Sequence, residues 1–196
     1  LTSDGHDLEN KPNLATLVSH ILFSIPNLKR LRLSSLDVAE IDKNLMDLIK
    51  YEKRILPHIH LSLQAGDNMI LKRMKRRHLR DDAISVINEI RCVRSEVVFG
   101  ADIIAGFPTE NDEMFQNTVD LIEDCNITFL HIFPFSPREG TPATRMPQVD
   151  RYIIKKRAKI LREIGKKKLL EYYDELKNKK INVIVEDKGR GRSDTF

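Results

Sequence analysis

Strand-like and helix-like patterns alternate at least four times between residues 28 and 136, and this alternation limits the possible folds more than any other feature. Strand character covers 28–35, 58–66, 96–108 and 127–136. Helical spacing covers 13–24, 42–52 and 109–126, and 67–93 is interpreted as a short helix, a basic turn and a second helix from about Asp81. Each unit has about the ~30 residues of a strand–helix repeat, so we predict an α/β fold of parallel strands with crossover helices. No G-x-G-x-x-G follows any strand, which favours a closed or nearly closed barrel over a doubly wound sheet.

The strand at 58–66 separates apolar from polar side chains by strict alternation. Ile59, Leu61 and Leu63 point to one face, where helices would cover them together with Leu31 and Leu33 of the preceding strand. The opposite faces would turn these side chains toward the barrel interior: Arg30, Arg32, Ser34, His60, Ser62, Gln64 and Asp102. Burying such groups without partners costs ~1–3 kcal/mol each. We therefore expect a wet or ligand-filled chamber for a zwitterionic polar ligand; the alternative is an ion-pair network among the two arginines and the aspartate.

Two of the helices have candidate N-caps in the sequence. Asp42 precedes the helix at 43–52, and Thr109 precedes a helix that would turn Phe115, Val119 and Ile122 inward. The strand at 96–108 is a nearly continuous apolar run, which is typical of a strand buried on both faces.

Composition describes an ordinary globular protein: 41% of the 196 residues are hydrophobic and 32% are charged. We find neither an apolar run of membrane-spanning length nor a signal-peptide pattern. Cys92 and Cys125 make no disulfide framework, so a cytoplasmic location is predicted, with both thiols as small buried hydrophobic groups. The net charge of +4 permits a nucleic-acid partner without requiring one.

Three regions follow from these patterns. Residues 1–149 hold the strand–helix units, 150–180 form one long basic helix, and 181–196 begin a new β segment. Lys166, Lys167 and Lys168 follow one another and so occupy different sides of that helix. Both ends of the chain look cut, and we interpret the sequence as a fragment of a longer chain.

Three motifs in this order resemble the radical-SAM methylthiotransferases that modify tRNA: HIHLSLQAGDNMILKRMKRRH, DIIAGFPTE and HIFPFSPREGTPATRM. The likeness runs from Leu1 to Phe196 and is strongest to the branch acting on N6-threonylcarbamoyladenosine at position 37 of tRNA. It implies a partial radical-SAM barrel, a basic linking helix, and from residue 181 the start of a TRAM-like RNA-binding domain. It also implies S-adenosylmethionine and [4Fe–4S] clusters as cofactors and tRNA as partner. Apart from the resemblance, we expect no membrane partner and a monomer, although the sequence leaves the oligomeric state open.

The resemblance also implies a set of cofactor-binding residues. Ser34, Gln64, Asp102 and Gly106 match strand-end positions that line the S-adenosylmethionine site, and Arg76 matches a basic residue near the cofactor carboxylate. Each has an alternative: Arg76 as a solvated cation, and Gly106 as the shape of a turn. His58 and His60 are interpreted as satisfied core imidazoles, and His131 and Phe133 as packing. No metal-ligand spacing surrounds the histidines, so no metal ligand and no catalytic residue is assigned.

The sequence departs from the family at the cluster. A C-x-x-x-C-x-x-C loop, whose three thiolates hold the radical cluster, has no counterpart here. The family's first strand and cluster domain have no counterpart either, and LTSDGHDLEN is shorter than the corresponding loop of relatives. We therefore expect a portion of a methylthiotransferase that is inactive by itself. The alternatives are a non-catalytic remnant that binds S-adenosylmethionine or tRNA and, ranked last, a metal-free barrel enzyme for a phosphorylated metabolite.

Overall fold

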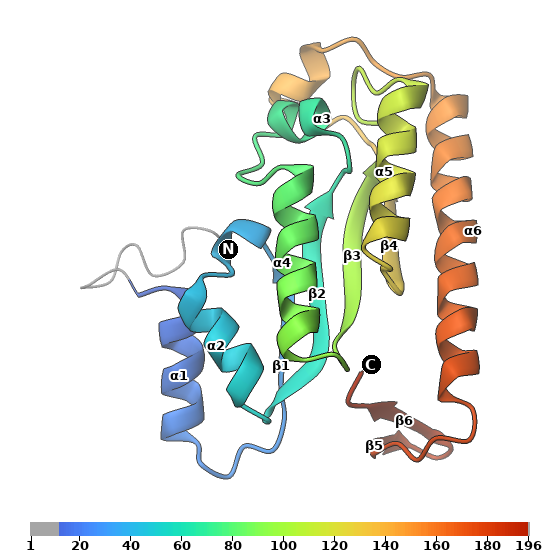
Figure 1. Ribbon diagram of the computed structural model, residues 1–196. Coiled ribbons are helices and arrows are strands. Elements are labelled where there is room, and N and C mark those ends of the chain that lie inside the picture. The colour runs from blue at the N-terminus through green and yellow to red at the C-terminus, as the bar shows by residue number, and fades with distance from the viewer. Residues whose placement is uncertain (1–11, 196) are drawn as a thin grey trace.

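A four-stranded parallel sheet forms the centre of the computed structural model, which describes residues 12–195 (Figure 1). The strands are β1 (Leu31–Leu36), β2 (Ile55–Gln64), β3 (Val98–Ala105) and β4 (Phe129–Pro134). They pair in chain order, β1-β2-β3-β4. The sheet therefore winds in one direction, as barrel strands do, and among the described residues it has no reversal of strand order. The predicted α/β class with a partial barrel of parallel strands is confirmed. The strand end and short loop expected at 1–10 lie outside the described residues.

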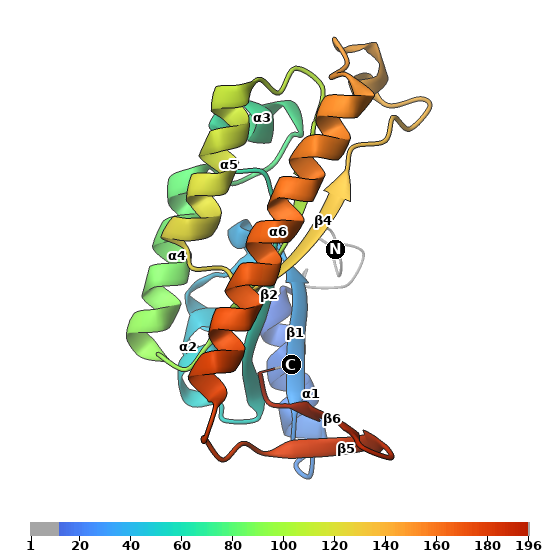
Figure 2. The ribbon, with the colours of Figure 1, turned by 90° about the vertical axis from the view of Figure 1, so that its right-hand side faces the viewer.

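Helices cover one face of this sheet. They are α1 (Leu14–Ser24), α2 (Lys43–Tyr51), α3 (Asn68–Arg73), α4 (Arg80–Val93), α5 (Asp112–Asp124) and α6 (Arg151–Leu176), with 3-10 turns η1 (Val38–Glu40) and η2 (Pro142–Arg145). α2, α4, α5 and α6 lie side by side over the sheet, and α1 packs against α2 (Figures 1 and 2). We call the helix-covered side of the sheet the outer face and the opposite side the inner face.

The hydrophobic core lies between the helices and the outer face. Ile59, Leu61 and Leu63 are fully buried there, as the alternation of β2 predicts, and Ile87 and Ile90 of α4 pack in the same cluster. A second, smaller cluster of Ala65, Ile70, Leu71 and Phe107 covers the carboxyl ends of β2 and β3.

Two local predictions were wrong. The N-cap of α5 is Asn111, whose side chain accepts from the Met114 amide, and not Thr109. Thr109 instead has a left-handed backbone, with φ 73°, and its hydroxyl accepts a hydrogen bond from Arg73. β3 is also not buried on both faces, because Asp102 and Ile104 remain partly exposed on the inner face.

The two cysteines differ in environment. Cys125 is buried, and burial raises the pKa of its thiol to about 11, as befits a small core residue. Cys92 is exposed on α4, so the prediction that it is buried was wrong.

The predicted long basic helix is α6, and two of its cations serve packing. Arg157 is 5% exposed and donates to Glu110 Oε1 at 2.9 Å and to Asp112 Oδ1 at 2.7 Å. Lys168 pairs with Glu123 of α5 at 2.6 Å. These contacts fasten α6 to α5 and to the loop after β3. The remaining cations of α6 lie at the surface: Arg151, Lys155, Lys156, Lys159, Arg162, Lys166 and Lys167.

After α6 the chain forms an antiparallel hairpin of β5 (Val183–Asp187) and β6 (Arg190–Ser193), as the new β segment predicted. Figure 2 shows the hairpin crossing below the sheet, beside the first residues of β1. Across 12–195, none of the helices combines the length and apolar character needed to cross a lipid bilayer.

Candidate functional site

Polar side chains line the inner face in a row across all four strands. Asp102 of β3 pairs in register with His131 of β4, and His60 of β2 pairs with Gly100, two residues before Asp102. Ser34 of β1 follows Leu33, which pairs with Ile59, so Ser34 and His60 lie at neighbouring positions. Because paired residues of parallel strands share a face, the row Ser34–His60–Asp102–His131 is built by strand register alone.

Asp102 is the centre of this row. His60 Nε2 lies 2.9 Å from Asp102 Oδ1, and His131 Nδ1 lies 3.4 Å from the same oxygen. The two imidazole rings are 4.6 Å apart between centroids. The His60 side chain is 6% exposed, Asp102 is 20% exposed and His131 is 54% exposed, so the row opens toward solvent at β4.

A glycine makes room for the His60 ring. A Cβ atom on Gly100 would lie 2.4 Å from His60 Nδ1, which is well inside van der Waals contact. The ring therefore leans over β3 because position 100 has no side chain, and this tilt brings Nε2 to Asp102.

Near the amino ends of the strands, the inner face is covered by the segment that ends the described part of the chain. Arg32 donates to the carbonyls of Ser193 and Asp194 at 3.2 and 3.3 Å, and Arg30 pairs with Asp194 at 3.0 Å. His58 is buried beside them, and burial, together with the positive charge of Arg32, lowers the pKa of His58 to about 4. His58 is therefore neutral at physiological pH.

The charged groups thus separate into two sets, so the alternative of one ion-pair network around Arg30, Arg32 and Asp102 was wrong, while the ligand chamber stays a prediction. The arginines of β1 hold the C-terminal segment, whereas Asp102 hydrogen-bonds to His60. They do not join one ion-pair network among the described residues. Arg32 and Asp102 do share the inner face, as the alternation predicted.

Two strands end in left-handed backbone. Ser35 in β1 has φ 56° and Gln64 at the end of β2 has φ 69°. Non-glycine residues in this region cost on the order of 1 kcal/mol each and concentrate at ligand sites. Both positions coincide with register shifts in the pairing of their strands. The direction of the Gln64 side chain is therefore set by this irregularity rather than by strand alternation.

Arg76 is part of a buried charge cluster at the carboxyl end of β1. It donates to Asp37 Oδ2 at 3.0 Å and to the Ser62 carbonyl at 2.8 Å. His78 Nδ1 lies 3.4 Å from the other oxygen of Asp37. The guanidinium is thus paired with a protein carboxylate rather than fully solvated, and its contact with the cofactor carboxylate stays a prediction.

Gly106 is buried where β3 meets the start of α6. Its φ is +76°, and an added Cβ would lie 2.5 Å from Ile154 Cγ1. Its amide donates to Glu110 Oε1 at 3.0 Å, and the same oxygen accepts from Arg157. The alternative interpretation of Gly106, in which it shapes the turn after the strand, fits these contacts.

Of the five sequence-predicted residues, the structure places Ser34 and Asp102 together on the inner face. Gln64 ends the adjacent strand, while Arg76 and Gly106 are held in packing contacts. Sequence reasoning missed the association of His60 and His131 with Asp102. The available signal was that each lies at an inner-face position of a neighbouring strand, but their pairing depends on register, which the sequence does not specify.

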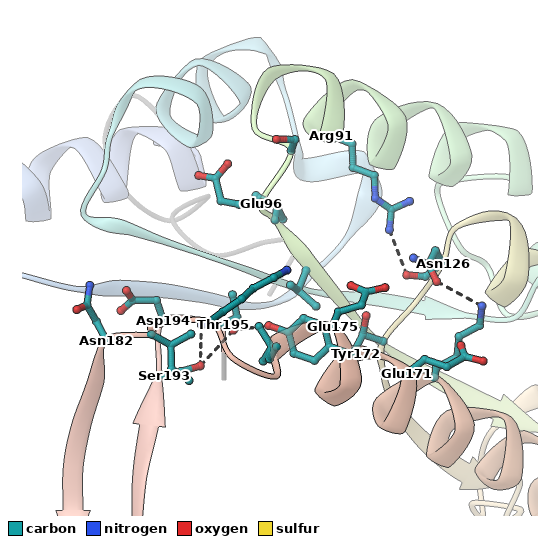
Figure 3. Close-up of a pocket in the computed structure, with 18 of the residues that line it drawn as sticks. Arg91, Glu96, Asn126, Glu171, Tyr172, Glu175, Asn182, Ser193, Asp194 and Thr195 are labelled. Carbon is teal, nitrogen blue, oxygen red and sulfur yellow. Dashed lines mark hydrogen bonds between the residues drawn. The ribbon is translucent and has the colours of Figure 1, made fainter.

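A cavity of about 530 Å³ lies at the amino ends of the strands, between α4, the second half of α6 and the hairpin (Figure 3). Arg91 donates to the Asn126 carbonyl there, and Tyr172 bonds to Thr195. Its lining mixes cations with Glu96, Glu171 and Glu175. It adjoins the amino ends of the strands, away from the residues of the inner-face row.

The fold and the polar inner face describe a barrel-type α/β protein with its candidate site on strand faces. Residues 10–122 match the family model of the radical SAM superfamily, and the chain belongs to this superfamily. Its fold is similar to that of coproporphyrinogen III oxidase from Escherichia coli, a radical SAM enzyme, with a TM-score of 0.65 at 14% identity over 81% of this chain and 38% of that chain.

Sequence relatives are tRNA methylthiotransferases. The chain is 50% identical over all 196 residues to the threonylcarbamoyladenosine tRNA methylthiotransferase MtaB of Rickettsia prowazekii, of which it covers 47%. It is 40% identical over 179 residues to the MtaB of Aquifex aeolicus, covering 91% of this chain and 43% of the relative. The chain therefore spans about half the length of the curated relatives it matches. The recognition of this family from the three motifs is confirmed.

Proposed function

We propose that this chain is the central portion of a methylthiotransferase that modifies carbon 2 of N6-threonylcarbamoyladenosine at position 37 of tRNA, with S-adenosylmethionine bound against the inner face. The observation that carries the proposal is the 50% identity to a threonylcarbamoyladenosine tRNA methylthiotransferase along the whole chain. The inner-face row supports it, because it offers a hydroxyl, a carboxylate and imidazoles on adjacent strands.

The residues of the inner face fit S-adenosylmethionine. Ser34 is exposed and Asp102 is partly exposed, so the Ser34 hydroxyl can donate to or accept from polar groups of the cofactor, and the Asp102 carboxylate can accept from its hydroxyl and amino groups. Gln64 ends β2 in strained backbone beside them. Arg76 donates to Asp37 and to the Ser62 carbonyl through Nη2, so it stays in the proposed site as a guanidinium that can also donate to the cofactor carboxylate.

The [4Fe–4S] cluster does not fit the residues of this chain. One cluster needs three thiolates on one loop, and the sequence holds two cysteines. Cys92 is exposed on α4 and Cys125 is buried at the end of α5, outside the inner face. The role proposed for these 196 residues is therefore to bind and orient the cofactor, and the cluster ligands would belong to other sequence.

RNA contact is proposed for the C-terminal part. Lys155, Lys156 and Lys159 are exposed on α6, and cations of this kind meet phosphates. The hairpin of β5 and β6 is proposed as the start of a TRAM-like module from residue 181, after the region 1–149 and the linking helix 150–180. A monomeric state and a cytoplasmic location remain predictions.

Calorimetry with S-adenosylmethionine tests the binding part of this proposal. The Ser34→Ala variant should lose about tenfold in affinity, as expected for one hydrogen bond of ~1.4 kcal/mol. The matched control is Ser19→Ala, an exposed serine on α1 that should bind like the unaltered chain. If the unaltered chain and both variants bind S-adenosylmethionine with equal affinity, the proposal that it binds against the inner face is wrong.

Mass spectrometry of tRNA nucleosides tests the reaction. The protein that carries this chain together with a cluster domain should produce the 2-methylthio derivative of threonylcarbamoyladenosine, and the 196-residue chain should not. Binding without product in both proteins would favour a non-catalytic remnant that retains S-adenosylmethionine or tRNA affinity, an alternative motivated by the two-cysteine count.

A further inference from the structure

We propose that His60, Asp102 and His131 form a binding site for a divalent first-row transition-metal ion on the inner face. The three residues come from three adjacent strands, and one ligand atom from each lies within 4.8 Å of the other two. Two imidazole nitrogens and one carboxylate oxygen are a donor set that suits ions such as Zn²⁺, Co²⁺ and Fe²⁺. The site shares Asp102 and the inner face with the proposed S-adenosylmethionine site, but it uses no cluster cysteine, and metal binding in the absence of S-adenosylmethionine tests it separately.

The distances among the donors are close to those that a bound ion requires. Metal–nitrogen and metal–oxygen bonds of ~2.0–2.1 Å place adjacent donors ~2.9 Å apart in octahedral and ~3.3 Å apart in tetrahedral geometry. His60 Nε2 and Asp102 Oδ1 are 2.9 Å apart, and Asp102 Oδ1 and His131 Nδ1 are 3.4 Å apart. Only the two nitrogens need to approach each other, and His131, which is half exposed, can rotate to do so.

The site is partly held in place before any ion binds. The His60 ring occupies the space that a side chain at position 100 would fill, so its Nε2 is aimed at Asp102. The His60 side chain is only 6% exposed. Asp102 and His131 are paired in register on neighbouring strands. Rigid strands position ligands more accurately than loops do, which lowers the entropy cost of binding.

Three protein ligands leave coordination positions open. The exposed edge of the site is at His131, so these positions face the solvent side of the inner face rather than the core. A closed structural site would have four protein ligands, whereas three ligands with an open position are typical of sites that bind water or a donor atom of a ligand. The proposed ion would therefore hold an oxygen or nitrogen atom of a guest molecule at the inner face.

The test is a titration of the untagged, chelator-treated chain with Co²⁺, followed by visible absorption, and with Zn²⁺, followed by calorimetry. The unaltered chain should bind one equivalent and give the absorption bands of Co²⁺ coordinated by nitrogen and oxygen. His131→Ala and Asp102→Asn should each weaken binding more than ~100-fold, beyond the ~10–100-fold that loss of an outer contact produces.

Two features make the result decisive. His131 is exposed, so its replacement leaves folding intact, and circular dichroism of each variant verifies this. The matched control is His20→Ala, which removes an exposed histidine on α1 and should leave binding unchanged. Absence of binding at up to about 1 mM ion, or equal binding by the His131→Ala variant, would overturn the proposal.

Discussion

The two faces of the same four strands have opposite character. On the outer face, Ile59, Leu61 and Ile103 are completely buried under helices. On the inner face, one residue away along each strand, Ser34, Asp102 and His131 reach solvent. Alternation of side chains therefore divides each strand between a face that stabilises the fold and a face that is available for ligands. Substitutions at adjacent positions should have very different consequences.

The largest effect is expected on the outer face. Ile59→Ala should lower the free energy of unfolding by about 3–4 kcal/mol, because it removes three buried carbons and leaves a cavity in a site that is fully enclosed. Urea denaturation measures this value. A loss below about 1 kcal/mol would mean that the outer face is not the core, and the comparison between the faces would fail.

A substitution at Gly106 tests whether this residue shapes the turn after β3 or lines the cofactor site. Gly106→Ala should cost about 2–4 kcal/mol in unfolding free energy, because a Cβ both meets Ile154 and is strained at φ +76°. The same denaturation experiment applies, together with S-adenosylmethionine affinity of the folded fraction. If the variant keeps its stability but loses affinity for S-adenosylmethionine, Gly106 is part of the cofactor site.

The pH dependence of stability tests whether His58 is buried near the amino ends of the strands. The folded chain keeps His58 neutral because its pKa is lowered to about 4, whereas the unfolded chain takes up a proton at the ordinary value of 6.5. Stability contributed by this residue is therefore present above pH 6.5 and is lost as the pH falls toward 4, by about 3 kcal/mol.

Thermal unfolding between pH 7 and pH 4 measures this slope in the unaltered chain and in His58→Leu. The variant should retain only the smaller slope of other groups, among them His78, whose pKa burial also lowers. Identical slopes in both proteins would show that His58 is solvated rather than buried.

The smallest effect on stability is expected for the exposed members of the inner-face row. Ser34→Ala and His131→Ala should each change the free energy of unfolding by less than about 0.5 kcal/mol, because neither residue contributes to the core. Denaturation curves that overlap with that of the unaltered chain would support the division of the sheet into two faces. A loss above about 1 kcal/mol would place these residues among the packing contacts.

Much of the architecture could be predicted from the sequence because it depends on local patterns. The alternation at 58–64 identifies the buried side of β2, and Asp42 caps α2 as expected. The N-cap of α5 was misplaced by two residues because Thr109 takes a left-handed conformation, with its amide bonded to the Pro147 carbonyl and its hydroxyl to Arg73, and these contacts come from distant segments. Cys92 was misassigned because a helical residue of this type can face either side.

The order of strands and helices, the polar side of each strand and the likeness to methylthiotransferases could all be read from the residues alone. The meeting of particular polar side chains could be learned from the folded chain and not from those patterns. Strand register joins His60, Asp102 and His131 across three strands, while Arg76 is taken up by Asp37 and Gly106 by Ile154. The physical reason is that periodicity operates within one segment, whereas hydrogen bonds and close contacts between segments depend on distances that no single segment encodes.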